Sequence, residues 1–232
     1  MLYKRILLKL SGEYFRQSKT GGLDFNAVKK IAQEIVSAFK LGVQIAVVVG
    51  AGNIFRGRNK PEWFDRVAAD NIGIVATYPN AMALVETIHH FGVSAHLMSA
   101  LALGGISREI DAFRARKLLE KNNLIVFAGG TGNAYVTTDT AAVLRALEIQ
   151  ADALFKGTTV DGVYSADPKV DSSAKKYSRL TYSQVLKSSL RAMDMTAFAL
   201  ARDNNLPLVI FKWEKGNLCR VLKGEKMGTI VR

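Results

Sequence analysis

Residues 26–53, NAVKKIAQEIVSAFKLGVQIAVVVGAGN, hold the pattern that decides the fold. Apolar side chains recur at the spacing of one helix face over about residues 26–41, and Gly42 is a typical stop signal. The run that follows, residues 43–49, is almost entirely apolar and predicts a buried strand that ends in a glycine-containing turn at residues 50–53. A helix followed by a buried strand is the repeating unit of α/β proteins.

The same alternation continues on both sides of this stretch. Further strands are expected at residues 6–8, 93–98, 124–128, 153–156 and 208–211, with a short one at the C-terminus. Further helices are expected at residues 107–121, 139–150, 182–188 and 195–204, with two more between residues 54 and 92 that divide near Pro79. This pattern predicts an α/β fold with a mostly parallel, twisted sheet sandwiched between helices. No linker or repeat interrupts residues 1–232, so one domain is expected.

The composition is typical of a globular protein of the cytoplasm. Of 232 residues, 49% are hydrophobic, enough for a sizeable core. Cys219 is the only cysteine, which excludes an intramolecular disulfide and is typical of a reducing compartment. Lys9 interrupts the first apolar run, so no signal peptide is expected, and the longest apolar stretch, residues 43–51, is too short to span a bilayer. We expect a cytoplasmic protein with no membrane partner.

The formal net charge of +12 allows two kinds of partner. Lysine and arginine can neutralise the phosphates of a nucleic acid, or they can favour small anionic ligands. The basic residues are spread along the chain, and no block of five like charges occurs. Nucleic acid is therefore the less favoured partner, and small anions are the more favoured one.

Three glycine-containing turns follow three of the expected strands. They are Ser11-Gly12, residues 50–53 and residues 129–133. Ligands of open α/β sheets bind outside the carboxyl ends of the strands, and glycine there lets backbone N–H groups approach an anion. A single turn of this kind is explained by steric needs alone. Three on one sheet edge predict a site long enough for two phosphate-bearing ligands.

The common nucleotide and metal signatures are absent from the sequence. No Gly-Lys dipeptide occurs, which excludes a P-loop, and Phe55 stands where a dinucleotide-binding fingerprint needs its third glycine. His89 and His90 are adjacent, so they point about 100° apart on a helix and cannot share a metal ion. No Cys/His/carboxylate spacing resembles a zinc site, and no metal site held by protein ligands alone is expected.

Charged residues beside the glycine turns indicate phosphoryl transfer. Lys9 and Lys156 each end an apolar strand, where a lysine is unfavourable unless it reaches a partner or water. A solvated strand end explains either lysine alone. Two of them beside glycine turns suit a reaction in which positive groups neutralise phosphate charge. Asp139 can hold the lysines in place, and Thr138 is expected to cap the helix that begins there.

Four motifs taken together resemble those of the bacterial UMP kinases, which belong to the amino acid kinase superfamily. The resemblance covers residues 4–229 and includes Met193-Asp194. The motifs are Lys9-Leu10-Ser11-Gly12-Glu13, Gly50-Ala51-Gly52-Asn53-Ile54-Phe55-Arg56-Gly57, Thr131-Gly132-Asn133 continuing to Thr137-Thr138-Asp139-Thr140, and Val160-Asp161-Gly162-Val163-Tyr164-Ser165-Ala166-Asp167-Pro168. The first motif alone would place only the superfamily.

The resemblance implies a kinase that transfers the γ-phosphoryl group of ATP, bound with Mg²⁺, to UMP. It implies catalytic roles for Lys9, Lys156 and Asp139. The residues it implies for ATP are Lys9, Leu10, Ser11, Gly12, Gly52, Arg56, Lys156, Thr158, Tyr164 and Asp167. Those it implies for UMP are Ala51, Asp70, Thr131, Gly132, Asn133, Ala134, Tyr135, Val136, Thr137 and Thr138, with Asp70 on the ribose. A solvated surface role beside Arg66 is the alternative for Asp70.

The sequence departs from the family pattern at three places. Ala51 replaces a glycine, and residues 134–136 replace the usual Pro-Phe-Phe. The family's bacterial members are typically homohexamers activated by GTP, but Val85 and His96 stand near positions where arginines would serve GTP. We therefore expect a homohexamer with little response to GTP. The alternatives are a related kinase acting on a carboxylate or carbamate, and a basic nucleic-acid-binding regulator that has lost catalysis.

Overall fold

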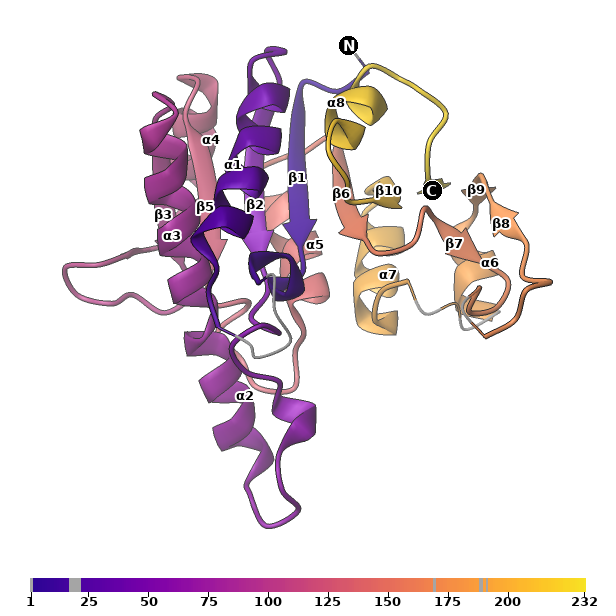
Figure 1. Ribbon diagram of the computed structural model, residues 1–232, viewed down its shortest axis with the longest axis horizontal. Coiled ribbons are helices and arrows are strands. Elements are labelled where there is room, and N and C mark those ends of the chain that lie inside the picture. Colours follow the sequence, from indigo (N-terminus) through magenta and orange to yellow (C-terminus); the bar gives the residue numbers. More distant parts are fainter. Residues whose placement is uncertain (1, 17–21, 169, 188–189, 191) are drawn as a thin grey trace.

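One sheet runs through the described part of the chain, which in this computed structural model comprises residues 2–16, 22–168, 170–187, 190 and 192–232 (Figure 1). All of its neighbouring strands are parallel except β10 and β11, which are antiparallel. The order is β4 (Arg108–Glu109), β3 (Ala95–Ser99), β5 (Leu124–Ala128), β2 (Gln44–Val49), β1 (Arg5–Leu10), β6 (Ala153–Thr158), β10 (Leu208–Lys212), β11 (Thr229–Val231) and β9 (Arg179–Leu180). A separate hairpin pairs β7 (Val163–Tyr164) with β8 (Lys176–Tyr177).

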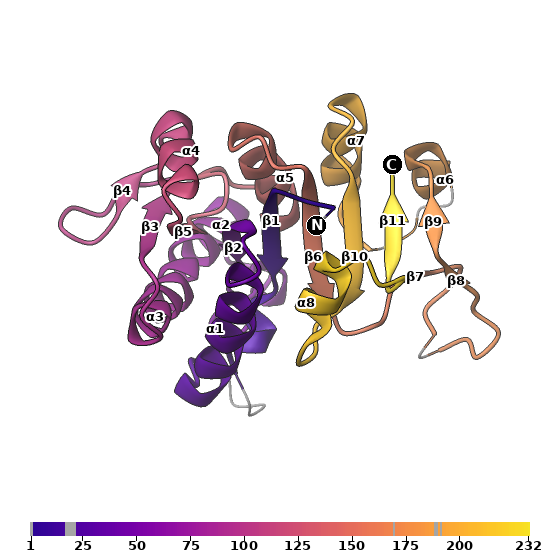
Figure 2. The same ribbon diagram turned by 90° about the horizontal axis from the view of Figure 1, so that it is seen from above.

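Helices cover both faces of this sheet, as Figure 2 shows from above. One face carries α1 (Phe25–Phe39), α3 (Thr77–His90) and α8 (Asn217–Leu222). The other carries α4 (Ala112–Glu120), α5 (Thr138–Glu148), α6 (Tyr182–Lys187) and α7 (Met195–Asp203). The predicted α/β sandwich is confirmed. No helix of the described residues is long and apolar enough to cross a membrane.

The side chains of strand β1 alternate between the two faces of the sheet. All six of its residues are buried, as expected for a central strand of a parallel sheet. Leu8 and Leu10 belong to the core under α1, whereas Leu7 belongs to the core under α5. Because side chains alternate along a strand, Lys9 lies on the same face as Leu7, toward α5.

Two predicted boundaries were wrong. The break between α2 (Arg66–Val75) and α3 lies at Ala76, and Pro79 sits in the first turn of α3, where its missing N–H costs little. Helix α4 starts only after Asp111, whose carboxylate accepts hydrogen bonds from the N–H groups of Phe113 and Arg114. The segment before it forms β4 instead of helix.

Further short elements were missed in the sequence. Helix α8 is only six residues long, too short for a helical period to emerge. The segment 157–176, expected to be a loop, contains the end of β6 and the hairpin of β7 with β8. The segments between β2 and α3, with the short 3₁₀ helix Gly57–Asn59 and α2, extend beyond the carboxyl ends of the central strands (Figure 1).

Candidate active site

Lys9 and Lys156 lie side by side on neighbouring parallel strands. The register of β1 and β6 pairs these two residues directly, so their side chains leave the sheet on the same face. Asp139, in the first turn of α5, reaches both of them: its Oδ1 is 2.7 Å from Lys9 Nζ and its Oδ2 is 2.5 Å from Lys156 Nζ. The three side chains are only 9%, 11% and 14% exposed for Lys9, Lys156 and Asp139. The sequence prediction placed these residues together, and the structure does the same.

The electrostatics of this cluster favour an additional negative ligand. Burial raises the pKa of Asp139, but Lys9 and Lys156 outweigh it and hold that pKa below its usual value. Burial lowers the pKa of Lys156, as does Lys9, while Asp139 opposes the shift. Two lysines against one carboxylate leave an excess positive charge in a poorly solvated place. A phosphoryl group with its negative charge would relieve it.

A cavity of about 330 Å³ opens beside the cluster. It brings together four residues predicted for ATP, namely Lys9, Ser11, Lys156 and Thr158. The other residues around it are Glu13, Tyr14, Gly157, Thr159, Val160, Gly162, Ala192 and Ile210. Tyr164 and Asp167 do not line it. Tyr164 lies on β7, and its hydroxyl donates a hydrogen bond to Asp161.

The first two glycine turns pack directly against each other. A Cβ atom at Gly12 would lie 2.5 Å from the backbone nitrogen of Gly52 and 2.6 Å from Asn53 Oδ1, so only glycine fits there. A Cβ atom at Gly50 would, in turn, lie 3.1 Å from the Gly12 nitrogen and 3.6 Å from the Thr138 hydroxyl oxygen. Leu10 and Ala51 are buried beside these contacts. The backbones of the two turns therefore meet at the carboxyl edge of the sheet, next to the start of α5.

Arg56, predicted for ATP, contacts Glu13 and the second turn. Its guanidinium pairs with the Glu13 carboxylate, and its Nε lies 3.4 Å from the Gly52 carbonyl oxygen. Arg16 pairs with the same carboxylate. Partial burial raises the pKa of Glu13, but the two arginines lower it further than that. Glu13 was quoted in the first motif without a role, and the structure shows that it connects the two turns.

The third turn leads into the loop of residues 131–138, predicted to hold UMP, between β5 and α5. Gly129, Gly130 and Gly132 have φ angles of +77°, +56° and +79°. Tyr135 has φ +65°, which is unfavourable for a residue with a side chain. The predicted helix cap was wrong by one residue: Thr137, not Thr138, caps α5, since its hydroxyl oxygen accepts from the N–H groups of Asp139 and Thr140.

Asp70, on α2, contacts the middle of this loop. Its Oδ2 accepts a hydrogen bond from the Tyr135 N–H at 2.8 Å and pairs with Arg66 Nε at 2.7 Å. Partial burial raises its pKa, but these two contacts hold it below the ordinary value, so the carboxylate stays charged. Asp70 therefore contacts the loop predicted for UMP, and it also makes the surface ion pair considered as its alternative role.

Two buried polar residues of α3, which were missed in the sequence, hydrogen-bond the backbone of the second and third glycine turns. Thr77 accepts a hydrogen bond from the Gly129 N–H at 2.7 Å, and Asn80 donates to the Gly50 carbonyl at 2.8 Å. Asn80 also exchanges two hydrogen bonds with Asn53. Both side chains are almost fully buried. A threonine and an asparagine within the buried part of a helix were the only signal for this role.

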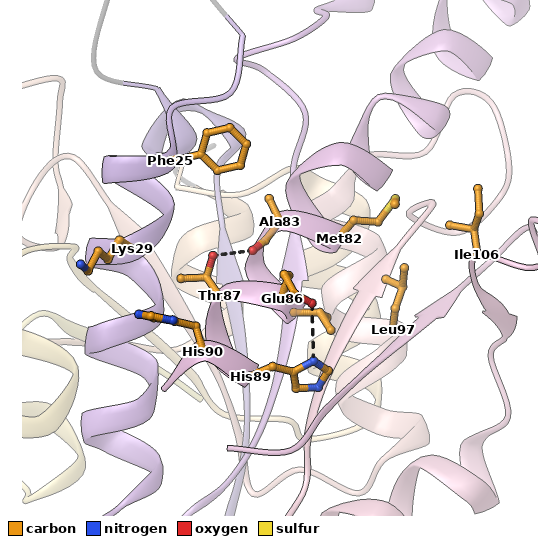
Figure 3. A pocket seen from close by; sticks show the side chains of 11 residues that line it. Phe25, Lys29, Met82, Ala83, Glu86, Thr87, His89, His90, Leu97 and Ile106 are labelled. Atoms are coloured by element: carbon orange, nitrogen blue, oxygen red, sulfur yellow. Dashed lines mark hydrogen bonds and ion pairs between the residues drawn. The ribbon is translucent and has the colours of Figure 1, made fainter. Parts of the chain in front are cut away.

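A larger cavity of about 760 Å³ lies between α1 and α3 and contains none of the predicted catalytic or nucleotide-binding residues (Figure 3). Phe25 and Lys29 of α1 and Met82, Glu86 and His89 of α3 contribute to its walls. His89 hydrogen-bonds the Ala95 carbonyl at 2.9 Å, which is a structural contact. Among the described residues, no group of three or more His, Cys, Asp or Glu is arranged to hold a metal ion.

Two buried lysines that share one carboxylate, beside glycine turns at the carboxyl edge of a parallel sheet, define a phosphoryl-transfer site. Residues 4–212 match the model of the amino acid kinase family, and the chain belongs to that family.

Curated relatives and solved structures indicate which members of this family the chain is similar to. Uridylate kinases of Pectobacterium atrosepticum and Klebsiella pneumoniae are each 46% identical over 99% of this chain and 96% of their own length. The crystal structure of UMP kinase from Bacillus anthracis superposes with a TM-score of 0.96 at 37% identity, covering 99% of this chain and 96% of the other. The crystal structure of uridylate kinase from Archaeoglobus fulgidus superposes with a TM-score of 0.74 at 29% identity, covering 98% of this chain and 99% of the other. The family expected from the motifs is confirmed.

Proposed function

We propose that this chain transfers the γ-phosphoryl group of ATP to UMP, giving ADP and UDP. The observation that carries the proposal is the Lys9–Asp139–Lys156 cluster, which lies beside the cavity lined by ATP-side residues and at the end of the loop predicted for UMP. The names of the relatives, uridylate kinase and UMP kinase, support the same acceptor.

In this proposal the two lysines act on the phosphoryl group during its transfer. Lys9 and Lys156 stabilise the charge that spreads over the transferred phosphoryl oxygens, and Asp139 keeps both ammonium groups in position before the substrates arrive. The meeting point of the turns at Gly12 and Gly52 offers backbone N–H groups to the phosphates of ATP. The loop 131–138 and Asp70 hold UMP at the other side of the lysines.

Magnesium enters this proposal with ATP. Mg²⁺ commonly keeps several waters and binds through one or two carboxylates plus substrate phosphates. Asp139 and Glu13, the carboxylates beside the cavity, are each engaged by two basic side chains. These residues fit an ion carried by the nucleotide better than one held in a protein cage. Bound Mg²⁺ would neutralise charge on the β- and γ-phosphates.

An ADP-release assay with ATP and Mg²⁺ tests the activity. UMP, CMP, dUMP, AMP and carbamate are offered in parallel as acceptors. We expect turnover to be fastest with UMP. Turnover with carbamate alone would favour the related kinase of a carboxylate or carbamate. An inactive protein that binds nucleic acid in a salt-dependent shift assay would favour the regulator without catalysis.

We also propose that the protein acts as a homohexamer in the cytoplasm. Several apolar side chains of α2 and α3 are exposed, among them Ile72 at 41%, Val75 at 53% and Met82 at 43%. Exposed apolar residues on neighbouring helices offer a plausible subunit contact. Light scattering at micromolar concentration should give a mass near six chains, and a stable monomer would contradict the proposal.

The proposed enzyme responds little to GTP. A site for a triphosphate in water needs several charge-assisted contacts, and Val85 and His96 replace the arginines expected there. The measurement is the rate at subsaturating ATP with and without GTP. A severalfold stimulation would show that other residues build an effector site.

A further inference from the structure

Asp194 makes more contacts than its place in α7 requires. As the N-cap of α7, it accepts a hydrogen bond from the Ala197 N–H at 2.9 Å. The same carboxylate also accepts from two hydroxyl groups at the start of α5, that of its N-cap Thr137 (Oγ1 at 2.5 Å) and that of Thr140 (Oγ1 at 2.9 Å). A helix cap needs only the first of these contacts. The other two tie the start of α5 to the start of α7.

The contacts with Thr137 and Thr140 fix the part of α5 that matters for the reaction. Thr137 caps α5 and immediately precedes Thr138, the last residue of the loop predicted for UMP. Asp139, the carboxylate between the two lysines, lies in the same turn. Hydrogen bonds to a charged acceptor are stronger and better oriented than those between neutral groups. Asp194 therefore restrains both the end of the acceptor loop and the residue that positions the lysines.

The segment that carries Asp194 also contacts Lys156. Lys156 Nζ donates a hydrogen bond to the Ala192 carbonyl at 2.6 Å, and Ala192 lines the cavity beside the cluster. Residues 192–194 thus contact the lysine on one side and the acceptor loop on the other.

We propose that Asp194 is a positioning residue for phosphoryl transfer, which aligns the acceptor loop, through Thr137, with the Lys9–Asp139–Lys156 cluster. Its carboxylate contacts no reacting atom in this role. The proposal rests on the proposed UMP kinase activity. It explains why the carboxylate binds two threonine side chains of another helix in addition to capping its own.

Steady-state kinetics of Asp194→Asn test the role. Asparagine keeps the size and one oxygen, so the cap can persist, but it removes the charge and one of the acceptors. We expect the KM for UMP to rise about tenfold, the size given by the loss of one charge-assisted hydrogen bond, with the KM for ATP nearly unchanged. Asp111→Asn is the matched control, because Asp111 caps α4 in the same way on an exposed part of the molecule.

Variants of Thr137 keep the test decisive if Asp194→Asn folds poorly. Thr137→Val removes the hydroxyl that donates to Asp194, and Thr137→Ser keeps it. We expect the valine variant to reproduce the rise in the KM for UMP, and the serine variant, which keeps the hydroxyl, to raise that KM less than the valine variant does. In the double variant Asp194→Asn with Thr137→Val, the two effects should not add, since both remove the same contact.

The pH profile of kcat gives a readout that a merely structural role would not change. The charged groups that act on Lys156 are Asp139, Lys9 and Asp194, and the last of these raises the pKa of Lys156. Removing the charge of Asp194 lowers that pKa, so the alkaline limb of the profile should move to lower pH in Asp194→Asn. It should stay in place in Asp111→Asn.

The outcomes separate this inference from the proposed function. A wild type without UMP-dependent ADP release would overturn the proposed function, and the inference with it. An active wild type whose Asp194→Asn variant behaves like Asp111→Asn would overturn the inference alone. So would equal rises in the KM for UMP and for ATP. A UMP-specific rise in Asp194→Asn and Thr137→Val that is smaller in Thr137→Ser, together with the shifted alkaline limb, would support it.

Discussion

The lysine cluster and the acceptor loop are built in opposite ways. Lys9, Asp139 and Lys156 are at most 14% exposed, and the register of two central strands places the lysines. The loop of residues 131–138 has Tyr135 67% exposed and Val136 39% exposed. Side chains of other elements, such as Asp70 and Asp194, hold this loop in place.

This difference indicates which region of the molecule tolerates substitution and which does not. Removing one partner of a buried ion pair leaves an uncompensated charge and costs about 3–5 kcal/mol, whereas an exposed pair is worth about 0–1 kcal/mol. The cluster is therefore intolerant of change. The loop can be altered one contact at a time, which suits a region that has to discriminate between acceptors.

The substitution Asp139→Asn should have the largest effect. It leaves Lys9 and Lys156 facing each other in a poorly solvated place, so we expect a loss of about 3–5 kcal/mol in the free energy of unfolding and the loss of most turnover. Urea denaturation and the ADP-release assay measure the two effects. Asp203→Asn is the control, because Asp203 pairs with Arg202 at an exposed position and its loss should cost under about 1 kcal/mol.

Acid titration checks the electrostatic origin of that loss. The pKa of Asp139 is depressed in the folded protein, so its contribution to stability is present above the unfolded value of about 3.9 and is lost as the pH falls toward the folded pKa. The wild type should lose stability over this acid range, and Asp139→Asn should lose less. Equal acid sensitivity of the two proteins would contradict the account of the cluster.

The substitution Lys9→Ala should have the next largest effect, and it should act on turnover. The charge of Lys9 matters most where phosphate charge redistributes, so we expect kcat to fall about 10²–10³-fold while UMP binding stays nearly intact. Lys40→Ala, which follows α1 at an exposed position, should leave kcat unchanged. A Lys9→Ala enzyme within tenfold of wild type would remove Lys9 from the catalytic role.

The substitution Asp70→Ala should affect acceptor binding alone. We expect the KM for UMP to rise about 10-fold, equivalent to about 1.4 kcal/mol, with little change in the KM for ATP. If Asp70 accepts hydrogen bonds from the ribose, dUMP should be a poorer substrate than UMP for the wild type, and this difference should vanish in the variant. A dUMP penalty that persists in Asp70→Ala would leave Asp70 with only its contacts to Tyr135 and Arg66.

The sequence predicted the cluster better than the loop, for a physical reason. Lysines in apolar strands violate a strong burial rule, so Lys9 and Lys156 stand out, and the parallel sheet brings strand ends together. The central strands and large helices were likewise predicted, because their apolar periods are long. The catalytic and nucleotide-binding roles of these residues stay predictions.

The parts that were missed depend on contacts between distant segments. Nothing local shows that Asn80 bonds the Gly50 turn or that Asp194 reaches Thr137, since such pairs are 30 and 57 residues apart in the chain. Short elements such as α8 and β4 are fixed by packing and caps, and boundaries at Ala76 and Asp111 depend on single residues. A capping threonine next to a second threonine gives no local reason to choose between them.

The smallest effect is expected at Tyr135, where the backbone has φ +65°. This conformation costs a residue with a side chain about 1–2 kcal/mol, while glycine there gives up about 0.4–1 kcal/mol through its freer unfolded state. The Arg66 guanidinium lies 5.1 Å from the centre of the Tyr135 ring, a contact worth about 0.5–1 kcal/mol at an exposed site. Tyr135→Ala loses the ring and keeps the unfavourable φ, so it should destabilise the protein by about 0.5–1 kcal/mol. Tyr135→Gly loses the same ring but relieves the backbone, so it should lie within about 0.5 kcal/mol of wild type and be the more stable of the two. Urea denaturation of both variants measures the difference, and an alanine variant as stable as the glycine one would show that the loop backbone carries no strain.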